Sequence, residues 1–216
     1  MQSWAVFDID GTLLPGESLE RRFLRLLKEK GILRPHHYLP FLLELLIKLP
    51  QFIQPGYFKS NKRYYRGLPA APILALAESC VREEAIPTIS KKGLEYIEHF
   101  KKEGVNILLL SGSPEFLVKP LAEMLVVPHY IGCRLEVKDH RFTGKLSGAH
   151  PFGTRKTDIL RDFQKKNPIN FKESIVFANH HSDYDHMKLF GRAVAVNPTP
   201  RLHSLAKKIN WPVEWW

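Results

Sequence analysis

Four short apolar runs stand out along the chain, and each of them ends at a polar residue. WAVF precedes Asp8, VNILLL precedes Ser111, IVFA precedes Asn179 and AVAV precedes Asn197. Unbroken apolar runs of this length are typical of parallel strands that are buried on both faces. Helical periodicity fills the intervals, and this alternation predicts an α/β protein with a doubly wound, mostly parallel sheet. Because such sheets bind ligands beyond the carboxyl ends of their strands, we expect the four polar residues to converge on one crevice.

The spacing of these runs predicts an insertion. About a hundred residues separate the first strand from the second, far more than one crossover helix needs. We therefore divide the chain into an α/β core of residues 1–16 and 88–216 and a small helical insertion of residues 17–87.

A second irregularity is RLEVKDHRFTGKL, residues 134–146. Polar and apolar side chains alternate along it, and Asp139 and His140 interrupt the alternation with turn-forming residues. This pattern predicts a β-hairpin.

Composition limits the class of protein. The chain has 216 residues, of which 44% are hydrophobic, so it can bury a proper core and is neither disordered nor fibrous. Lys and Arg outnumber Asp and Glu by 32 to 22, which favours attraction to phosphates, nucleic acid or anionic lipid without choosing among them.

Only Cys80 and Cys133 are present, without CxxC spacing, which excludes a disulfide framework and a cysteine zinc site. The first residues lack the basic and apolar regions of a signal peptide, so we expect a cytoplasmic protein.

Two stretches of the insertion allow alternative interpretations. YLPFLLELLIKLPQFI, residues 38–53, is too short to span a bilayer and is interrupted by prolines and charges. It is either an amphipathic helix packed on the core or a surface that contacts an anionic membrane. KSNKRYYR, residues 59–66, interleaves cations with tyrosines as nucleic-acid grooves can. We place it instead on a helix of the insertion or at the rim of the crevice, and expect no nucleic-acid partner.

The first strand is followed by DIDGTLL, in which two carboxylates stand two positions apart. Asp8 and Asp10 would face the same side of an extended chain, and Gly11 lets the backbone turn sharply. Crowded carboxylates repel each other, so such a pair usually holds a cation or divides the roles of acid and nucleophile. The alternative is structural, with Asp8 ending the strand and Asp10 capping a turn.

The second strand is followed by SGSPEF, which begins at Ser111. Ser113 is expected as the N-cap and Pro114 as the first residue of the next helix. A strand tip, Gly112 and a helix N-terminus together make an anion cradle. The alternative is simply a well-capped helix.

Lys156 lies in GTRKTDIL, where Thr154 is the expected N-cap. The lysine would then occupy the first helical turn, where the helix macrodipole disfavours a cation. A buried anion nearby would remove that penalty, whereas an exposed lysine would be screened by water.

The order of these motifs resembles that of a known family. DxDGT follows the first strand, SGS the second, a lysine begins a later helix, and an aspartate-bearing turn follows a further strand. In this respect the chain resembles the haloacid dehalogenase superfamily of phosphotransferases over most of its length. The insertion, the hairpin and the segment GRAVAVNPTPRLHSLAKKINWPV resemble its subfamily IB, the phosphoserine-phosphatase-like branch. The resemblance implies a Rossmann-like core with a small helical cap of the C1 type at residues 17–87.

Carried over residue by residue, the resemblance implies a Mg²⁺-dependent phosphomonoester hydrolase that acts on a small phosphorylated substrate. Asp8 would be the nucleophile that forms an aspartyl-phosphate, and Asp10 would be the general acid and then the general base. Ser111, Gly112 and Lys156 would bind the phosphate. Phosphoryl transfer depends on charge neutralisation and alignment, which a divalent ion, a lysine and a helix N-terminus can supply.

The resemblance also implies a magnesium site, with one departure from the family pattern. Mg²⁺ would contact Asp8 and the backbone carbonyl of Asp10, with Asn179 and Asp183 directed at it. The fourth motif of the family usually reads GDxxxD, and Asn179 replaces its first acid here. An amide oxygen can ligate Mg²⁺ but carries no formal charge, so we expect weaker metal binding. The alternative is a weakly active or non-catalytic protein that binds a phosphorylated ligand.

The cap would select the substrate. Glu17 stands where phosphoserine phosphatases carry a glutamate that recognises the substrate amino group. Arg63 and Arg66 are candidates for pairing with a substrate carboxylate. The apolar stretch of the cap leaves a lipid-phosphate phosphatase at the membrane surface as an alternative. Neither the substrate nor the oligomeric state follows from the sequence.

Overall fold

A six-stranded sheet forms the centre of the protein. The computed structural model describes residues 2–47 and 60–216, without the side chains of residues 45–47. The strand order is β3-β2-β1-β6-β7-β8, and every one of these pairings is parallel. The strands are β1 (Trp4–Phe7), β2 (Asn106–Pro114), β3 (His129–Cys133), β6 (Ile175–Ala178), β7 (Arg192–Val196) and β8 (Val213–Glu214). The apolar runs form strands because both of their faces are covered.

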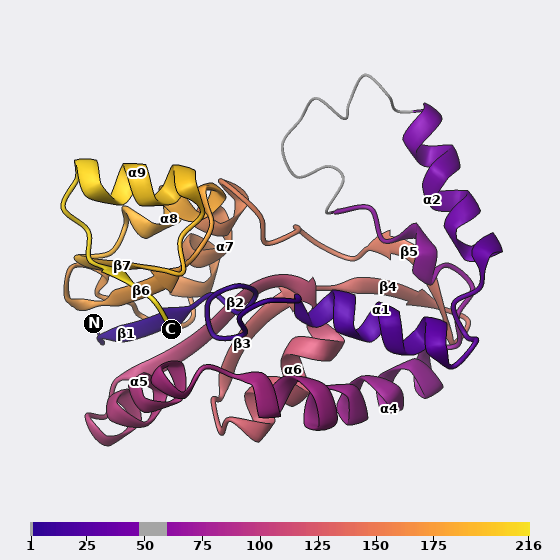
Figure 1. Cartoon of the computed structure of the whole chain (residues 1–216), viewed down its shortest axis with the longest axis horizontal. Helices are drawn as coiled ribbons and strands as arrows, with labels where there is room; N and C mark the ends of the chain where they lie inside the picture. The colour runs from indigo at the N-terminus through magenta and orange to yellow at the C-terminus, as the bar shows by residue number, and fades with distance from the viewer. Residues whose placement is uncertain (1, 48–59) are drawn as a thin grey trace.

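Helices cover both faces of the sheet, as Figure 1 shows. One face carries α5 (Lys91–Lys102) and α6 (Glu115–Met124), and the other carries α7 (Arg155–Gln164), α8 (Tyr184–Met187) and α9 (Pro200–Lys208). Successive strand residues point to opposite cores, since Phe7 packs in the α5 and α6 core and Val6 in the other. The predicted doubly wound α/β fold is confirmed.

The segment between β1 and α5 is mainly helical. It contains α1 (Leu19–Glu29), α2 (Pro35–Ile47), α4 (Ala70–Cys80) and the short turns η2 (Arg63–Tyr65), η3 (Val81–Ala85) and η4 (Ile86–Thr88). Helix α1 begins where the Ser18 side chain accepts a hydrogen bond from Arg21 N. Its buried Leu19, Phe23 and Leu27 recur at intervals of four and join the core. Residues 48–53 of the apolar stretch lie outside the described residues.

The predicted hairpin is present as β4 (Leu135–Lys138) and β5 (Arg141–Leu146). Asp139 and His140 reverse the chain with φ of 48° and 59°, the conformation of a two-residue hairpin turn. The hairpin also hydrogen-bonds to the insertion, because Gly67 N donates to the Phe142 carbonyl at 2.8 Å. It therefore extends from the core alongside the helical segment, as Figure 1 shows. This long-range contact groups the hairpin with the insertion in space, although the two are separate in sequence.

Candidate active site

The loop after β1 places the first carboxylate at the edge of the sheet. Asp8 N donates to the Phe177 carbonyl at 2.9 Å, so Asp8 continues the pairing of β1 with β6. The chain then reverses at Gly11, whose φ of +83° is a conformation that favours glycine. Thr12 Oγ1 donates to Asp8 Oδ2 at 3.2 Å. The Asp8 carboxylate is consequently oriented within its own loop, and the residue is only 7% exposed.

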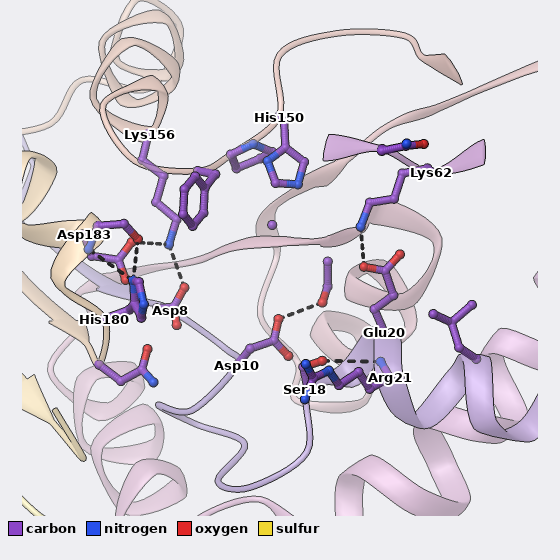
Figure 2. A pocket seen from close by; sticks show the side chains of 18 of the residues that line it. Asp8, Asp10, Ser18, Glu20, Arg21, Lys62, His150, Lys156, His180 and Asp183 are labelled. Carbon is purple, nitrogen blue, oxygen red and sulfur yellow. Dashed lines mark hydrogen bonds and ion pairs between the residues drawn. The ribbon is translucent and has the colours of Figure 1, made fainter. Parts of the chain in front are cut away.

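A single lysine connects two buried carboxylates. Lys156 Nζ lies 2.6 Å from Asp8 Oδ1 and 2.9 Å from Asp183 Oδ1. Thr154 occupies the predicted N-cap position of α7, but its side chain makes no capping hydrogen bond, and Lys156 stands in the first turn. The two carboxylates offset the unfavourable helix macrodipole at this position. Figure 2 shows the three side chains converging from different elements.

Burial and shared charge separate the pKa values of the two acids. Burial raises the pKa of Asp8 to about 7, and the neighbouring Asp183 opposes its ionisation further, against the attraction of Lys156. Burial would also raise the pKa of Asp183, but Lys156 and the neighbouring His186 hold it below its usual value. Burial alone would lower the pKa of Lys156, yet the two carboxylates raise it above its ordinary value. The lysine is therefore a permanent cation in this site.

Asp10 is held by three donors from two other elements. Leu19 N, at the start of α1, donates to Asp10 Oδ1 at 2.7 Å. Ser111 Oγ and Ser113 Oγ donate to Asp10 Oδ2 at 3.1 and 2.7 Å. These bonds orient the second carboxylate independently of the first.

Ser113 does not cap a helix, which corrects the expectation from sequence. Strand β2 continues through Pro114, and α6 begins at Glu115 with Pro114 in the capping position. The Ser113 hydroxyl donates to the Asp10 carboxyl group instead. Its backbone N–H donates to Ser111 Oγ at 2.9 Å. Both serines thus support Asp10 rather than the helix terminus.

Asn179 and Gly11 are in close contact. A Cβ atom placed on Gly11 would lie 1.9 Å from Asn179 Nδ2. The Asn179 carbonyl accepts a hydrogen bond from Thr199 N at 2.8 Å, which ties the loop after β6 to the start of α9. The amide side chain therefore lies directly over the loop that carries Asp8 and Asp10.

A cavity of about 440 Å³ unites most of the predicted residues. Its core side is lined by Asp8, Asp10, Gly112, Ser113, Lys156, Asn179, His180, Ser182 and Asp183, with His150, Pro151 and Phe152 from the loop before α7. Its other side is formed by the insertion, through Ser18, Glu20, Arg21, Leu24, Phe41, Asn61, Lys62 and Tyr64. Ser111 does not line the cavity and instead lies behind Asp10. Such a volume suits a small-molecule ligand.

The three cap candidates lie outside the lining of this cavity. Glu17 pairs with Arg25 at 3.2 Å, and Arg63 pairs with Glu44 at 2.7 Å. Arg66 is exposed. The insertion contributes other charged groups instead, which the sequence analysis did not single out. A partial signal was KSNKRYYR at the expected rim, whose Lys62 and Tyr64 line the cavity.

The oxygen-rich core side fits a hard divalent cation. When both acids are ionised, Asp8 and Asp183 carry two negative charges against the single charge of Lys156, so the formal charge of this buried group is then −1 before Asp10 is counted. Carboxylate, carbonyl and amide oxygens suit Mg²⁺. Among the described residues no group of three or more His, Cys, Asp or Glu side chains could hold a metal ion by itself. A metal here would therefore need Asn179, backbone or water oxygens in addition to the acids.

The fold and this site define a class of protein. The family model of the haloacid dehalogenase-like hydrolases matches residues 5–188, and the chain belongs to this family. It is 28% identical over 220 residues to the phosphoserine phosphatase SerB1 of Mycobacterium tuberculosis, covering 97% of this chain and 69% of the relative.

Solved structures show the same fold. A protein of unknown function from Bordetella pertussis has a TM-score of 0.81 at 20% identity, with 99% of each chain covered. A phosphoserine phosphatase with an analogue of its phospho-aspartyl intermediate has a TM-score of 0.65 at 21% identity, covering 99% of this chain and 93% of that one. The predicted superfamily, its phosphoserine-phosphatase-like branch and the class of enzyme, a phosphatase, are confirmed.

Proposed function

We propose that the protein is a Mg²⁺-dependent phosphomonoester hydrolase that acts through an aspartyl-phosphate on Asp8. The observation that carries this proposal is the arrangement of two separately oriented carboxylates in one cavity. Asp8 is paired with Lys156, whereas Asp10 is held by the start of α1 and the end of β2. Two carboxylates with different surroundings can take different chemical roles.

In the first step, Asp8 attacks phosphorus while the bond from phosphorus to the ester oxygen breaks. Asp10 donates a proton to the departing alcohol oxygen. In the second step, Asp10 removes a proton from the water that attacks the aspartyl-phosphate, which releases inorganic phosphate and restores Asp8. Lys156 stabilises the negative charge of the transferred group, and Gly112, in the last residues of β2, lines the cavity where phosphate would bind.

The proposed metal would be held by Asp8, the backbone carbonyl of Asp10, Asn179 and Asp183. When bound, it neutralises charge on the phosphoryl oxygens and favours the ionised form of Asp8. The single amide among its ligands predicts weaker binding than a set with three carboxylates would show.

The proposal is tested by hydrolysis of a generic phosphomonoester with and without Mg²⁺. Asp8→Asn should lower kcat by at least about a thousandfold, since it removes the nucleophile. Asp185→Asn is the matched control, because Asp185 is exposed and pairs with Lys188 at 3.1 Å, away from the cavity lining. Rapid acid quenching with a radiolabelled ester should leave label on the wild-type protein and none on Asp8→Asn. Equal rates for wild type and Asp8→Asn would refute the mechanism.

A lipid phosphate is a second candidate substrate, favoured by one observation. Helix α2 exposes Leu39, Leu42 and Leu43 to 55%, 47% and 48%, while Phe41 of the same helix lines the cavity. These leucines share one helix face by their spacing. Among the described residues no helix is long and apolar enough to cross a membrane, so contact would be peripheral.

We also propose a cytoplasmic location. Cys80 and Cys133 are both buried and unbridged, which is compatible with a reducing compartment.

A further inference from the structure

Asn197 ends the fourth apolar run and stands directly after β7. It is not among the residues that line the cavity. Its φ of +43° lies in the left-handed region, so the chain turns sharply at this residue. Asparagine tolerates this conformation better than most residues, which is a purely conformational reason for its presence.

The Asn197 amide is held between two backbone groups. Its Oδ1 accepts a hydrogen bond from Trp216 N at 2.8 Å, and its Nδ2 donates to the Gly11 carbonyl at 3.4 Å. A backbone N–H only donates and a carbonyl only accepts, so these partners determine which end of the amide faces Gly11. A positive φ alone would not require an amide, since glycine would serve equally well. The side chain therefore connects the segment after β8 to the loop that carries Asp8 and Asp10.

The oxygen end of the amide is anchored outside the cavity. Asn197 N donates to the Glu214 carbonyl at 2.8 Å. The Glu214 carboxylate accepts hydrogen bonds from Tyr96 Oη of α5 and from Trp216 Nε1, both at 2.9 Å. The rings of Trp216 and Tyr96 are stacked, with 5.5 Å between their centroids. Packing of β8 and Trp216 on α5 thus sets the position of the Asn197 amide.

The nitrogen end of the amide meets the most tightly packed part of the site. A Cβ on Gly11 would overlap the side chain of Asn179. Two residues beyond Asn197, Thr199 N donates to the Asn179 carbonyl at 2.8 Å. Residues 197–199 therefore hold both Gly11 and Asn179. Because Gly11 directly follows Asp10, a displacement of Gly11 is transmitted to the Asp10 backbone through a rigid peptide plane.

We propose that Asn197 is a positioning residue for catalysis, whose amide fixes the Gly11 carbonyl and so aligns Asp8 and Asp10 with the loop that carries Asn179. This inference rests on the proposed function, because it concerns the alignment of the proposed nucleophile and acid. Asn197 acts through Gly11 and not on the substrate. Alignment matters because a displacement of about 1 Å at the reacting groups can slow the chemistry about a hundredfold.

Asn197→Gly separates this role from a purely conformational one. Glycine accepts the positive φ without steric cost but removes both hydrogen bonds of the side chain. Asn210→Gly is the matched control, because Asn210 is exposed beyond α9, has a φ of +57° and does not line the cavity. Both variants gain the same freedom in the unfolded chain, so that cost cancels between them.

The kinetic readout is hydrolysis of a generic phosphomonoester at saturating Mg²⁺. In Asn197→Gly, kcat should fall by about tenfold to a hundredfold, because the reacting groups lose their alignment. KM should change by less than about threefold, since the groups that contact the phosphate remain in place. Asn210→Gly should keep both constants of the wild type. A purely conformational role for Asn197 predicts that the two variants have equal kcat, and this result would overturn the inference.

Hydrogen exchange measures the same anchoring without turnover. In a peptide that spans residues 8–14, the N–H groups of Gly11, Thr12 and Leu14 all donate to carbonyls within the loop. In the metal-free protein, Asn197→Gly should speed exchange of this peptide by about fivefold or more, whereas Asn210→Gly should leave it unchanged. Faster exchange together with a lower kcat supports the inference. Unchanged exchange in Asn197→Gly would overturn it.

Asn197→Asp decides if Asn197→Gly does not fold. It keeps the acceptor for Trp216 N and replaces the donor by an oxygen, which repels the Gly11 carbonyl. We expect kcat at saturating Mg²⁺ to fall about tenfold relative to Asn210→Asp, which adds the same charge at the control position. An effect of charge alone would lower the Mg²⁺ concentration for half-maximal rate and leave kcat at saturation unchanged. That result would overturn the inference.

Failure of the inference differs from failure of the proposed function. A wild-type protein that hydrolyses no phosphomonoester would refute the proposed function, and a role of Asn197 in catalysis with it. An active wild type whose kcat is matched by Asn197→Gly would overturn the inference alone.

Discussion

The side chain of Asn179 occupies the space that a Cβ on Gly11 would need, with only 1.9 Å between that position and Nδ2. Gly11 is thus required both by its φ of +83° and by its contact with Asn179. The loop that carries the two catalytic candidates and the loop with the unusual amide are therefore fitted to each other. A change on either side should affect the other.

Gly11→Ala should be strongly destabilising, and Gly16→Ala separates its two causes. Gly16 has a φ of +79°, but no atom of the described residues lies within 4 Å of the position that its Cβ would take. Its alanine variant therefore measures backbone strain alone, roughly 1–2 kcal/mol. Gly11→Ala adds a steric clash with Asn179, so its free energy of unfolding should fall by about 1–3 kcal/mol more than that of Gly16→Ala. Chemical denaturation of both variants checks this difference. Equal losses would show that Asn179 moves aside without cost.

Asn179→Asp should strengthen Mg²⁺ binding. The substitution adds a formal charge beside Asp8 and Asp183 without changing the size of the side chain. We expect the Mg²⁺ concentration for half-maximal rate to fall about tenfold, and the melting temperature of the metal-free protein to drop because carboxylates then repel each other. Added Mg²⁺ should raise the melting temperature more in the variant than in wild type. An unchanged Mg²⁺ titration would remove the proposed role of Asn179.

The pH dependence of stability should reveal two buried groups that titrate in opposite directions. The folded protein holds the Asp8 proton up to about pH 7, so this group stabilises the fold increasingly as pH falls from about 7 toward 3.8. Burial lowers the pKa of His186 to about 3, despite the adjacent Asp183, so that histidine destabilises the fold as pH falls below 6.5. In the metal-free protein the two effects should largely cancel between about pH 6.5 and 4.

Single substitutions separate the two groups. Asp8→Asn should leave the histidine effect and lose about 2 kcal/mol of unfolding free energy between about pH 6.5 and 5. His186→Leu should keep only the effect of Asp8, so its free energy of unfolding should rise by a similar amount as pH falls over the same range. Denaturation in the presence of a chelator measures both slopes. If the free energy of unfolding of the two variants changed with pH in the same direction, the assignment of the two effects to Asp8 and His186 would be wrong.

Membrane contact through α2 should be detectable with vesicles that contain anionic lipid. The double variant with Leu42→Glu and Leu43→Glu should co-sediment severalfold less than wild type, since charges oppose insertion of this face. Leu74→Glu is the control, because Leu74 is 46% exposed on α4. If wild type and the double variant sediment equally, α2 is not a membrane surface, and a lipid phosphate loses its support as substrate.

Much of the site followed from sequence because its chemistry lies at strand ends. Each apolar run ends at a polar residue, and a parallel sheet brings those ends to one edge regardless of details elsewhere. For Lys156 the sequence left two alternatives, a buried anion nearby or an exposed side chain screened by water, and the structure shows the first, with Asp8 and Asp183 as the anions. The two-residue turn of the hairpin followed from residues that tolerate positive φ.

Only the tertiary structure decided which polar side chain meets which partner. Ser113 has the sequence of a helix cap, yet the approach of Asp10 gives its hydroxyl a carboxyl oxygen as acceptor instead. Glu17 and Glu20 are three positions apart, but Arg25 holds one of them on the surface while Lys62 holds the other in the cavity. Periodicity and local propensity determine strands, turns and the order of motifs, because they act between near neighbours in the chain. Partner choice depends on distances between segments that only the packed fold sets. The sequence therefore determined that polar residues end the strands at one edge of the sheet, whereas the structure decided which group each of them contacts.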